Sequence, residues 1–251
     1  MIKFFRNIRQ RLLTENRFSK YMLYAFGEIL LVVIGIIIAL QINNWNSERL
    51  KNDRNHKLLV KLSSELELNI ERATLLDSIG FGNLSDRETL MDSVITLLNN
   101  NMLADYTDYV IDASHFWVNT LNLNTAVFEE LKNTGSLYSI GSDSLVTEIQ
   151  RYYQLCERES FYNLDFGEKT DRLRDKCLEG WFDFKYLYQR NPEEAVKHHP
   201  WIKDPRSQQY IHFRQFITSA RFHSYLMSMK LKGLMEESEK LKELIDLEIN
   251  S

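Results

Sequence analysis

The residue with the most unusual chemical setting is Glu28, an ionisable side chain inside an apolar run. Residues 21–42 read YMLYAFGEILLVVIGIIIALQI, and Glu28 is the one charged residue among them. A carboxyl group inside a bilayer is costly and by default marks a functional site or a contact with a partner helix. The sequence leaves two roles open. One is an ion- or proton-coupled role, and the other is a protonated carboxyl group hydrogen-bonded within a homo-oligomer.

Glu28 shares a helical face with small residues. Glu28, Val32, Gly35 and Ala39 are separated by alternating steps of four and three residues, which places them on one side of a helix. Gly35 and Ala39 form a small-x-x-x-small pair, the pattern that lets two membrane helices approach closely. We therefore predict that these four residues form a helix–helix interface in the membrane and that the chain is a homo-oligomer.

Residue types that support catalysis or metal binding are present, but their spacing matches no established site. The sequence has no Gly-rich phosphate loop, no His-Glu-x-x-His, no Cys-x-x-Cys and no Gly-x-Ser-x-Gly. The adjacent pair His198 and His199 is a weak metal candidate. We predict no catalytic residue, no cofactor and no metal, and therefore a protein that is not an enzyme.

The two cysteines, Cys156 and Cys177, are predicted to be buried free thiols. On one straight helix they would lie ~31 Å apart, whereas the Cα atoms of a disulfide lie within ~7 Å. A disulfide would need a break in the chain near Gly167.

The apolar run is predicted to be an uncleaved membrane anchor. Its aliphatic residues contribute about -5 kcal/mol to insertion, against up to ~3 kcal/mol lost at Glu28. Residues 1–43 carry a net charge of +4 and the remainder carries -8, although the whole chain is only -4. The positive-inside rule then places the N-terminus in the cytoplasm. We predict a cytoplasmic basic amphipathic segment at 1–20, a transmembrane helix at 21–43 and an external helical domain at 44–251.

The composition predicts an all-α fold. Only 9 Gly and 3 Pro occur in 251 residues, and the first Pro is Pro192, which favours long helices over turn-rich β or α/β folds. Apolar residues at steps of three and four predict an elongated antiparallel helical bundle after the span. The expected helices cover 46–79, 85–98, 105–121, 125–133, 143–190 with possible bends at Gly167 and Gly180, and 207–249, with a Pro-containing loop at 192–205.

Two stretches resemble a family of single-span membrane proteins of Bacteroidota that has no assigned activity. They are FSKYMLYAFGEILLVVIGIIIALQINNWN near the N-terminus and VFEELKNTGSLYSIGSDSLVTEIQRYY in the centre. The resemblance extends over nearly the whole chain and implies a Gram-negative envelope, with residues 44–251 in the periplasm. Phe128, Glu129, Tyr152 and Tyr153 belong to the second stretch, and we expect them to form a partner or ligand face. Glu129 or Glu130 could also pair with Lys132 or cap a neighbouring helix.

These observations favour a membrane-anchored periplasmic scaffold that oligomerises and binds other envelope proteins. The acidic outer part gives no reason to expect a nucleic-acid partner. Two alternatives stay open. One is a periplasmic sensor or ligand-binding module that signals through a partner, and the other is an accessory subunit of an ion-coupled membrane complex that uses Glu28.

Overall fold

The computed structural model describes residues 18–78, 84–105, 107–108, 120–177 and 179–250. All regular structure within these ranges is helical, with no strand among them. The predicted all-α class is therefore confirmed for the described residues. The α-helices are α2 (Phe18–Ser78), α3 (Leu84–Asn99), α5 (Ala126–Thr134), α6 (Asp143–Cys177), α7 (Trp181–Tyr188), α8 (Pro192–His198) and α9 (Gln208–Ile249), and the 3-10 helices are η1 (Leu103–Asp105), η2 (Ser136–Ser139) and η3 (Pro200–Lys203).

The chain divides into two compact units, Met1–His56 and Lys57–Ser251. In the first unit, the N-terminal part of α2 is the single helix among the described residues that is long and apolar enough to cross a membrane. Its large apolar side chains from Met22 to Ile42 are exposed, as a lipid-facing surface requires. It is a candidate membrane span. The predicted amphipathic segment 1–20 lies almost wholly outside the described residues.

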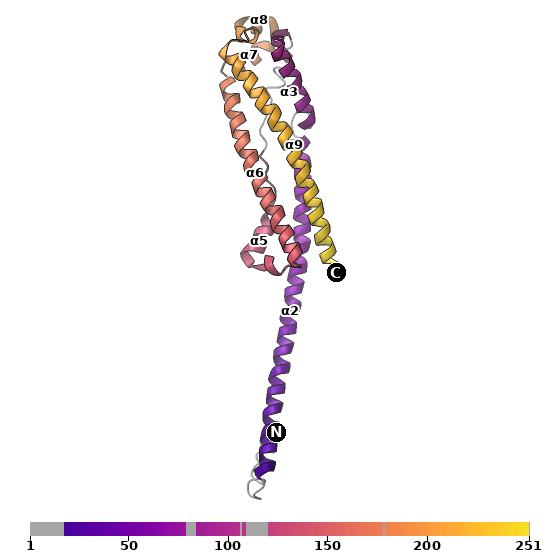
Figure 1. Cartoon of the computed structure of the whole chain (residues 1–251). Helices are drawn as coiled ribbons and strands as arrows, with labels where there is room; N and C mark the ends of the chain where they lie inside the picture. Colours follow the sequence, from indigo (N-terminus) through magenta and orange to yellow (C-terminus); the bar gives the residue numbers. More distant parts are fainter. Residues whose placement is uncertain (1–17, 79–83, 106, 109–119, 178, 251) are drawn as a thin grey trace. The chain divides into compact units, whose positions relative to one another are not determined.

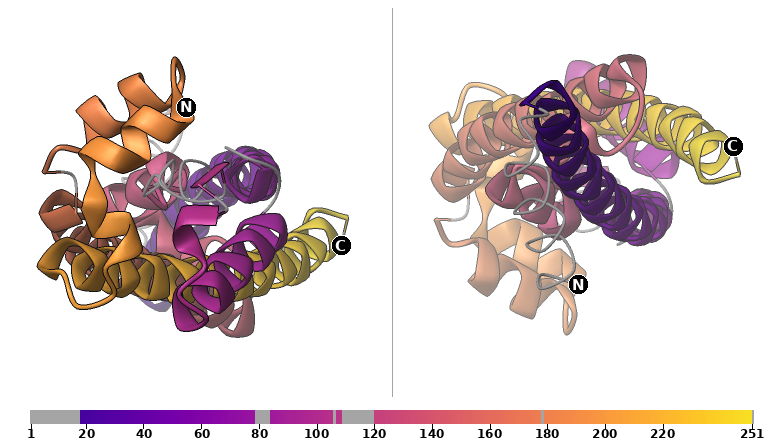
Figure 2. Two further views of the ribbon diagram at one scale, coloured as in Figure 1. Left: turned by 90° about the horizontal axis from the view of Figure 1, so that it is seen from above. Right: turned by 90° about the horizontal axis from the view of Figure 1, so that it is seen from below.

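In the second unit, α9 is the helix against which α3 and α6 pack (Figure 1). The contacts of α6 move toward the start of α9 as the residue number in α6 rises. Tyr152 bonds Ser238, whereas Thr170 bonds Ser219. These two helices therefore pair in opposite directions. α7 and α8 contact each other and lie at the same end of the unit as the beginning of α9, and Figure 2 shows this end from above.

Two apolar clusters form the core of the second unit. The first joins α2, α5, α6 and the second half of α9, and it includes Leu66, Leu131 and Ile149. The second joins α3, α7, η3 and the first half of α9, and it includes Phe184 and Phe213. Cys156 belongs to the first cluster and Cys177 to the second, and both are free thiols, as predicted. Burial raises the pKa of Cys156 to about 11 and that of Cys177 to about 12, so neither thiol is activated.

The predicted helix 143–190 is too long as one helix, and of its two possible bends the one at Gly180 is confirmed. α6 ends at Cys177, and Gly180 adopts a left-handed conformation (φ 72°) before α7 begins. A continuing right-handed helix cannot contain such a residue. Gly167, the other predicted bend, lies inside α6 and is buried.

The predicted loop at 192–205 is also wrong, since it contains α8 and η3. Pro192 occupies the first turn of α8, where the missing N–H of proline costs nothing. The side chain of Asn191 caps that helix by accepting from the Glu194 N–H. Most of the predicted helix 105–121 falls at 106 and 109–119, outside the described residues.

Gly135 closes α5 and should resist replacement. It is left-handed (φ 71°), and its N–H bonds the Lys132 carbonyl at the end of the helix. A Cβ at Gly135 would meet no neighbouring atom, so the cost of Gly135→Ala is conformational strain alone, about 1–2 kcal/mol of unfolding free energy. Gly233 in α9 is an opposite control. It is helical and also has space for a Cβ, so Gly233→Ala should stabilise by about 0.4–1 kcal/mol. Denaturant titrations measure the change in unfolding free energy for each variant. Changes of the same sign for Gly135→Ala and Gly233→Ala would contradict the left-handed strain assigned to Gly135.

Candidate functional site

Residues 120–125 form a short connection without helix, whose backbone groups are satisfied by buried side chains from two helices. Asn69 of α2 donates to the Asn124 carbonyl over 3.0 Å and accepts from the Asn124 N–H over 2.6 Å. Asn163 of α6 accepts from the Leu121 N–H over 3.1 Å. The Ser160 hydroxyl donates to the Leu121 carbonyl over 2.7 Å. Side chains of α2 and α6 thus hold the backbone of this non-helical connection in place.

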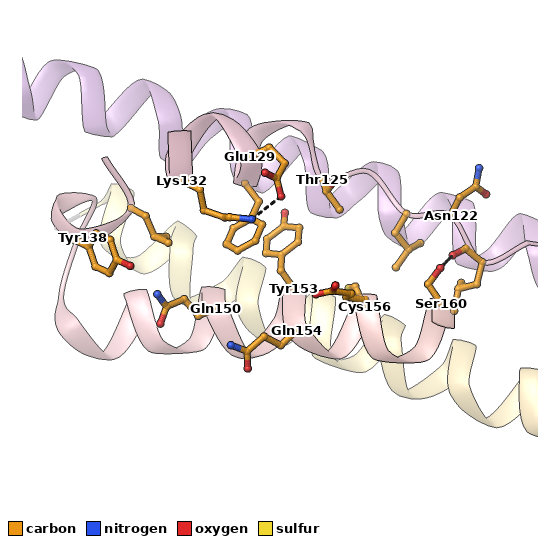
Figure 3. Close-up of a pocket in the computed structure, with 15 residues that line it drawn as sticks. Asn122, Thr125, Glu129, Lys132, Tyr138, Gln150, Tyr153, Gln154, Cys156 and Ser160 are labelled. Carbon is orange, nitrogen blue, oxygen red and sulfur yellow. Dashed lines mark hydrogen bonds and ion pairs between the residues drawn. The ribbon is translucent and has the colours of Figure 1, made fainter. Parts of the chain in front are cut away.

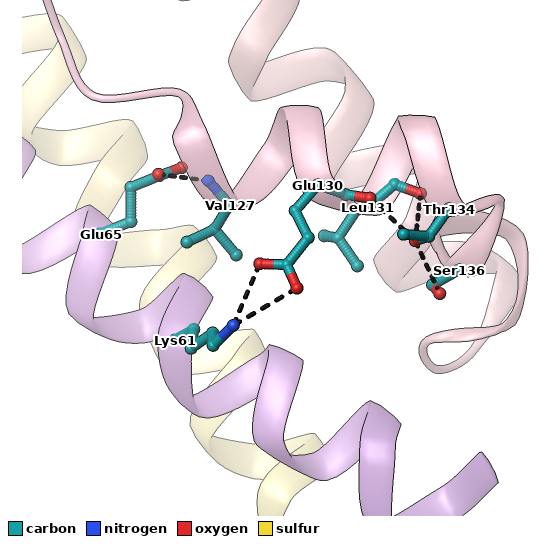
Figure 4. A network of polar contacts seen from close by, with 7 residues as sticks. All are labelled: Lys61, Glu65, Val127, Glu130, Leu131, Thr134 and Ser136. Carbon is teal, nitrogen blue, oxygen red and sulfur yellow. Dashed lines mark hydrogen bonds and ion pairs between the residues drawn. The ribbon is translucent and has the colours of Figure 1, made fainter.

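Glu65 of α2 continues this pattern into the first turn of α5. One carboxyl oxygen accepts from the Val127 N–H over 2.7 Å, and the other accepts from the Tyr153 hydroxyl over 2.5 Å. Thr125, the cap residue of α5, makes no side-chain capping bond. Glu65 therefore supplies from another helix the cap that the local sequence lacks, and its negative charge suits the positive end of α5. Figure 4 shows this bond and the neighbouring ion pair between Lys61 and Glu130 (3.0 Å).

Tyr152 and Tyr153 enter the same buried network from α6. The Tyr152 hydroxyl lies 2.8 Å from the Ser238 hydroxyl and accepts from Asn69 over 3.4 Å. Burial raises the pKa of both tyrosines, and at Tyr153 the adjacent Glu65 carboxyl group raises the pKa further. Both hydroxyls therefore stay protonated at physiological pH and act as hydrogen-bonding groups that fix α6 relative to α2 and α9.

An open pocket of about 720 Å³ lies beside this network (Figure 3). α6 contributes one side of it, including Gln150, Gln154 and Glu157, and α5, η2 and residues 121–125 contribute the rest. We call this pocket the α6 groove. Phe128 of α5 and Tyr153 of α6 stack inside it, with ring centroids 4.1 Å apart and planes within 4°. The groove therefore combines an aromatic wall with amide and carboxylate groups, the mixture that is typical of sites for ligands and peptides.

The four residues predicted as a partner or ligand face divide between the groove and the core. Phe128, Glu129 and Tyr153 line the groove, and Glu129 pairs with Lys132 over 2.9 Å, as the sequence suggested. Tyr152 is the exception, because it is completely buried and does not line the groove. A partner at the surface can contact Phe128, Glu129 and the edge of Tyr153, but it cannot contact Tyr152.

The four residues of the predicted membrane interface lie on the candidate span. Glu28, Val32, Gly35 and Ala39 are all exposed in the single chain. A Cβ at Gly35 would meet no atom within 4 Å. These positions are therefore accessible to a second helix, and their role as an interface stays a prediction.

The residues that the sequence did not reveal are Glu65, Asn69 and Asn163. In the first outer helix the polar Asn69 is buried, whereas its apolar neighbour Ile70 is only half-buried. A signal was present, because Asn69 continues the alternating steps of four and three set by Leu62 and Leu66. A polar residue at such a position needs a buried partner. The partner, the backbone of Asn124, could not be identified from helical periodicity.

No group of three or more His, Cys, Asp or Glu side chains that could hold a metal ion occurs among the residues that the structure describes. His198 is exposed, and its Nε2 lies 3.6 Å from Oε1 of Glu194. His199 packs edge-on against Phe184, with ring centroids 5.3 Å apart. The structure thus assigns packing to His199, and the predicted lack of a metal or cofactor stays a prediction.

No curated protein matches the chain, and no solved structure matches it either. A family model does match, over residues 28–179. This range begins at Glu28, contains Glu65, Asn69 and the α6 groove, and ends after α6. The chain belongs to DUF6090, a family of unknown function.

Proposed function

We propose that this chain is a non-enzymatic scaffold protein, anchored in the inner membrane of a Gram-negative bacterium of the Bacteroidota and binding other envelope proteins from the periplasm. The observation that carries the proposal is that one helix, α2, contains both the candidate span and residues of the core of the second unit. The positive charge before residue 21 supports a cytoplasmic N-terminus. In this proposal, residues 44–251 form an elongated antiparallel bundle in the periplasm.

The test is purification of the tagged full-length chain from its native membrane in a gentle detergent, followed by mass spectrometry. The proposal expects specific envelope proteins to copurify in fixed proportion with the chain. A tagged chain of the same membrane with an unrelated outer domain is the control for adventitious capture. Recovery of the chain with lipid alone would contradict the scaffold function, and a protease-resistant C-terminal tag in spheroplasts would contradict the periplasmic location.

A second candidate function, a periplasmic sensor or ligand-binding module, is favoured by the α6 groove. Its volume of about 720 Å³ lies within the range of small-molecule sites, about 300–1,000 Å³. The groove is open to solvent, however, and most small-molecule sites enclose the greater part of their ligand. Native mass spectrometry of the purified chain distinguishes the two functions, because a sensor should retain a molecule of fixed mass.

Oligomerisation through the span gives a prediction of its own. Glu28→Gln and Glu28→Leu should both weaken the homo-oligomer, because each removes the carboxyl group that pairs with the neighbouring helix. Gly35→Ile should weaken it as well by holding the helices apart. Gly27→Ile is the matched control, since Gly27 also has space for a side chain but lies off the face of Glu28 and Gly35. Crosslinking in detergent measures the effect, and unchanged assembly in all three interface variants would remove the pairing role.

A further inference from the structure

The second unit already holds one non-helical segment of its own chain through side chains of neighbouring helices. Residues 120–125 have no helix, and Asn69, Ser160 and Asn163 complete the hydrogen bonds of Leu121 and Asn124. Amide and hydroxyl side chains can donate to a backbone carbonyl and accept from a backbone N–H. A surface built in this way can hold a peptide backbone of any sequence.

The α6 groove presents the same chemistry on its open side. Gln150, Gln154 and Glu157 follow one another along α6 at steps of four and three, and all three line the groove. Within the described part of the chain, none of the three forms a hydrogen bond or an ion pair. From Gln150 to Ser160 the helix rises about 15 Å, which matches about four or five residues of extended peptide at about 3.3 Å each.

The charges of the groove define what an occupying segment should carry. Lys132 is already paired with Glu129 and lies 5.1 Å from the Phe128 ring centroid. Glu157 is exposed and is the carboxyl group of the groove that lacks an ion pair within the described ranges. A basic side chain of the occupant would form an ion pair with Glu157. Apolar side chains would pack against the half-buried Leu123 and Phe128.

We propose that the α6 groove binds an extended segment of a partner protein, about four or five residues long, in which apolar side chains accompany one Lys or Arg that pairs with Glu157. The inference rests on the proposed scaffold function, because it names the chemistry of the partner that such a scaffold would recruit. The Gln150 and Gln154 amides bond the backbone of the segment, and Leu123 and Phe128 contact its apolar side chains.

The first experiment selects peptides from a phage-displayed library of random seven-residue sequences on the full-length protein in lipid nanodiscs. The selected sequences should share one basic residue next to apolar residues. Synthetic copies with a fluorescein label then give dissociation constants by fluorescence anisotropy. Selected peptides without basic enrichment would overturn the proposal.

A charge exchange tests whether the binding occurs at Glu157. Glu157→Lys should weaken the basic peptide at least tenfold, and a peptide in which its Lys is replaced by Glu should recover affinity for this variant. Glu157→Gln, which keeps the shape of the side chain, should give a smaller loss of the same sign. Glu168→Lys is the matched control, because Glu168 is an exposed carboxyl group on α6 outside the groove. Equal binding to wild type and Glu157→Lys would overturn the proposal.

Two further outcomes would assign the groove to a different occupant and so overturn the proposal that it binds a peptide segment. One is a retained small molecule that Glu157→Lys releases, and the other is a Gln154→Cys variant that crosslinks to a second copy of itself. The groove and the scaffold function can fail separately. If Glu157→Lys keeps the envelope proteins that copurify with wild type, the groove inference fails and the scaffold stands. If wild type copurifies none, the scaffold function fails.

Discussion

Replacing Glu65 by Ala should lower the free energy of unfolding by about 2–4 kcal/mol. Glu65 is only 4% exposed, and both of its oxygens accept hydrogen bonds, from Val127 and Tyr153. The substitution removes the cap of α5, worth about 1 kcal/mol. The cap is the hydrogen bond from the Val127 N–H. The substitution also leaves the buried Tyr153 hydroxyl without its acceptor, at about 1–3 kcal/mol. Urea unfolding of the full chain in detergent, followed by tryptophan fluorescence, measures the loss.

Three variants show whether this loss comes from the cap. Glu67→Ala changes an exposed carboxyl group on the same helix, which pairs with Lys242, and should cost at most about 0.5–1 kcal/mol. Glu65→Gln keeps one acceptor oxygen and should cost about half as much as Glu65→Ala. Tyr153→Phe combined with Glu65→Ala should cost less than the sum of the two single changes, because they remove one shared bond. A cost for Glu65→Ala no larger than that for Glu67→Ala would show that the cap has no energetic importance.

Acidification should destabilise the second unit by about 3 kcal/mol through His223 alone. Burial is the main cause that lowers the pKa of His223 to about 4. A hydrogen bond with the Asn163 backbone opposes the shift, and the positive charges of Lys230 and Arg87 add to it. Because the folded pKa lies below the unfolded value of ~6.5, the unfolded chain takes up a proton first as the pH falls. The contribution of neutral His223 to the free energy of unfolding is therefore fully present above pH ~6.5 and is lost progressively as the pH falls to ~4. His223 is only 5% exposed, so solvent screens this effect little.

The effect of His223 is separated from that of the carboxyl groups by a difference measurement. Lys or Arg partners lower the pKa values of three carboxyl groups, those of Glu159, Glu237 and Asp246. The stability that these carboxylates contribute is also lost in acid, as the pH falls below their ordinary titration range. His223→Gln keeps a polar side chain beside Asn163 and removes the titration. Between pH 6.5 and 4 the wild-type protein should lose about 3 kcal/mol more unfolding free energy than the His223→Gln variant. Parallel pH profiles for the two proteins would contradict the buried neutral state of His223.

The hydrophobic periodicity of the sequence located the long helices well, because it depends on neighbours within the same helix. α9 and α5 each begin and end within one residue of the predicted ranges 207–249 and 125–133. Where the prediction was wrong, the deciding feature was backbone geometry at one or two residues. The left-handed Gly180 divided the predicted helix 143–190, and capping by Asn191 turned the predicted loop into α8.

The candidate site was predictable only in part. The pattern around Phe128 indicated a region that does line the α6 groove. The sequence left open whether Glu129 or Glu130 pairs with Lys132, and the structure pairs Glu129 with Lys132 and Glu130 with Lys61. The sequence did not predict that Tyr152 lies in the core while Tyr153 lines the groove. Adjacent residues of a helix point about 100° apart. Only the positions of α2, α5 and α9 decide that Tyr152 meets Ser238 while Tyr153 meets Glu65 and Phe128.

The sequence by itself determined the helical class, the apolar candidate span and the separation of charge between its two sides. These properties follow from composition and from contacts between residues a few positions apart. The tertiary structure decided which polar residues are buried and what they bind. Glu65 reaches the start of α5, and Asn69 reaches Asn124, across more than fifty positions of chain. A buried carboxyl or amide group is stable only where its partner is supplied, and the partner is supplied by packing between helices rather than by the pattern within one.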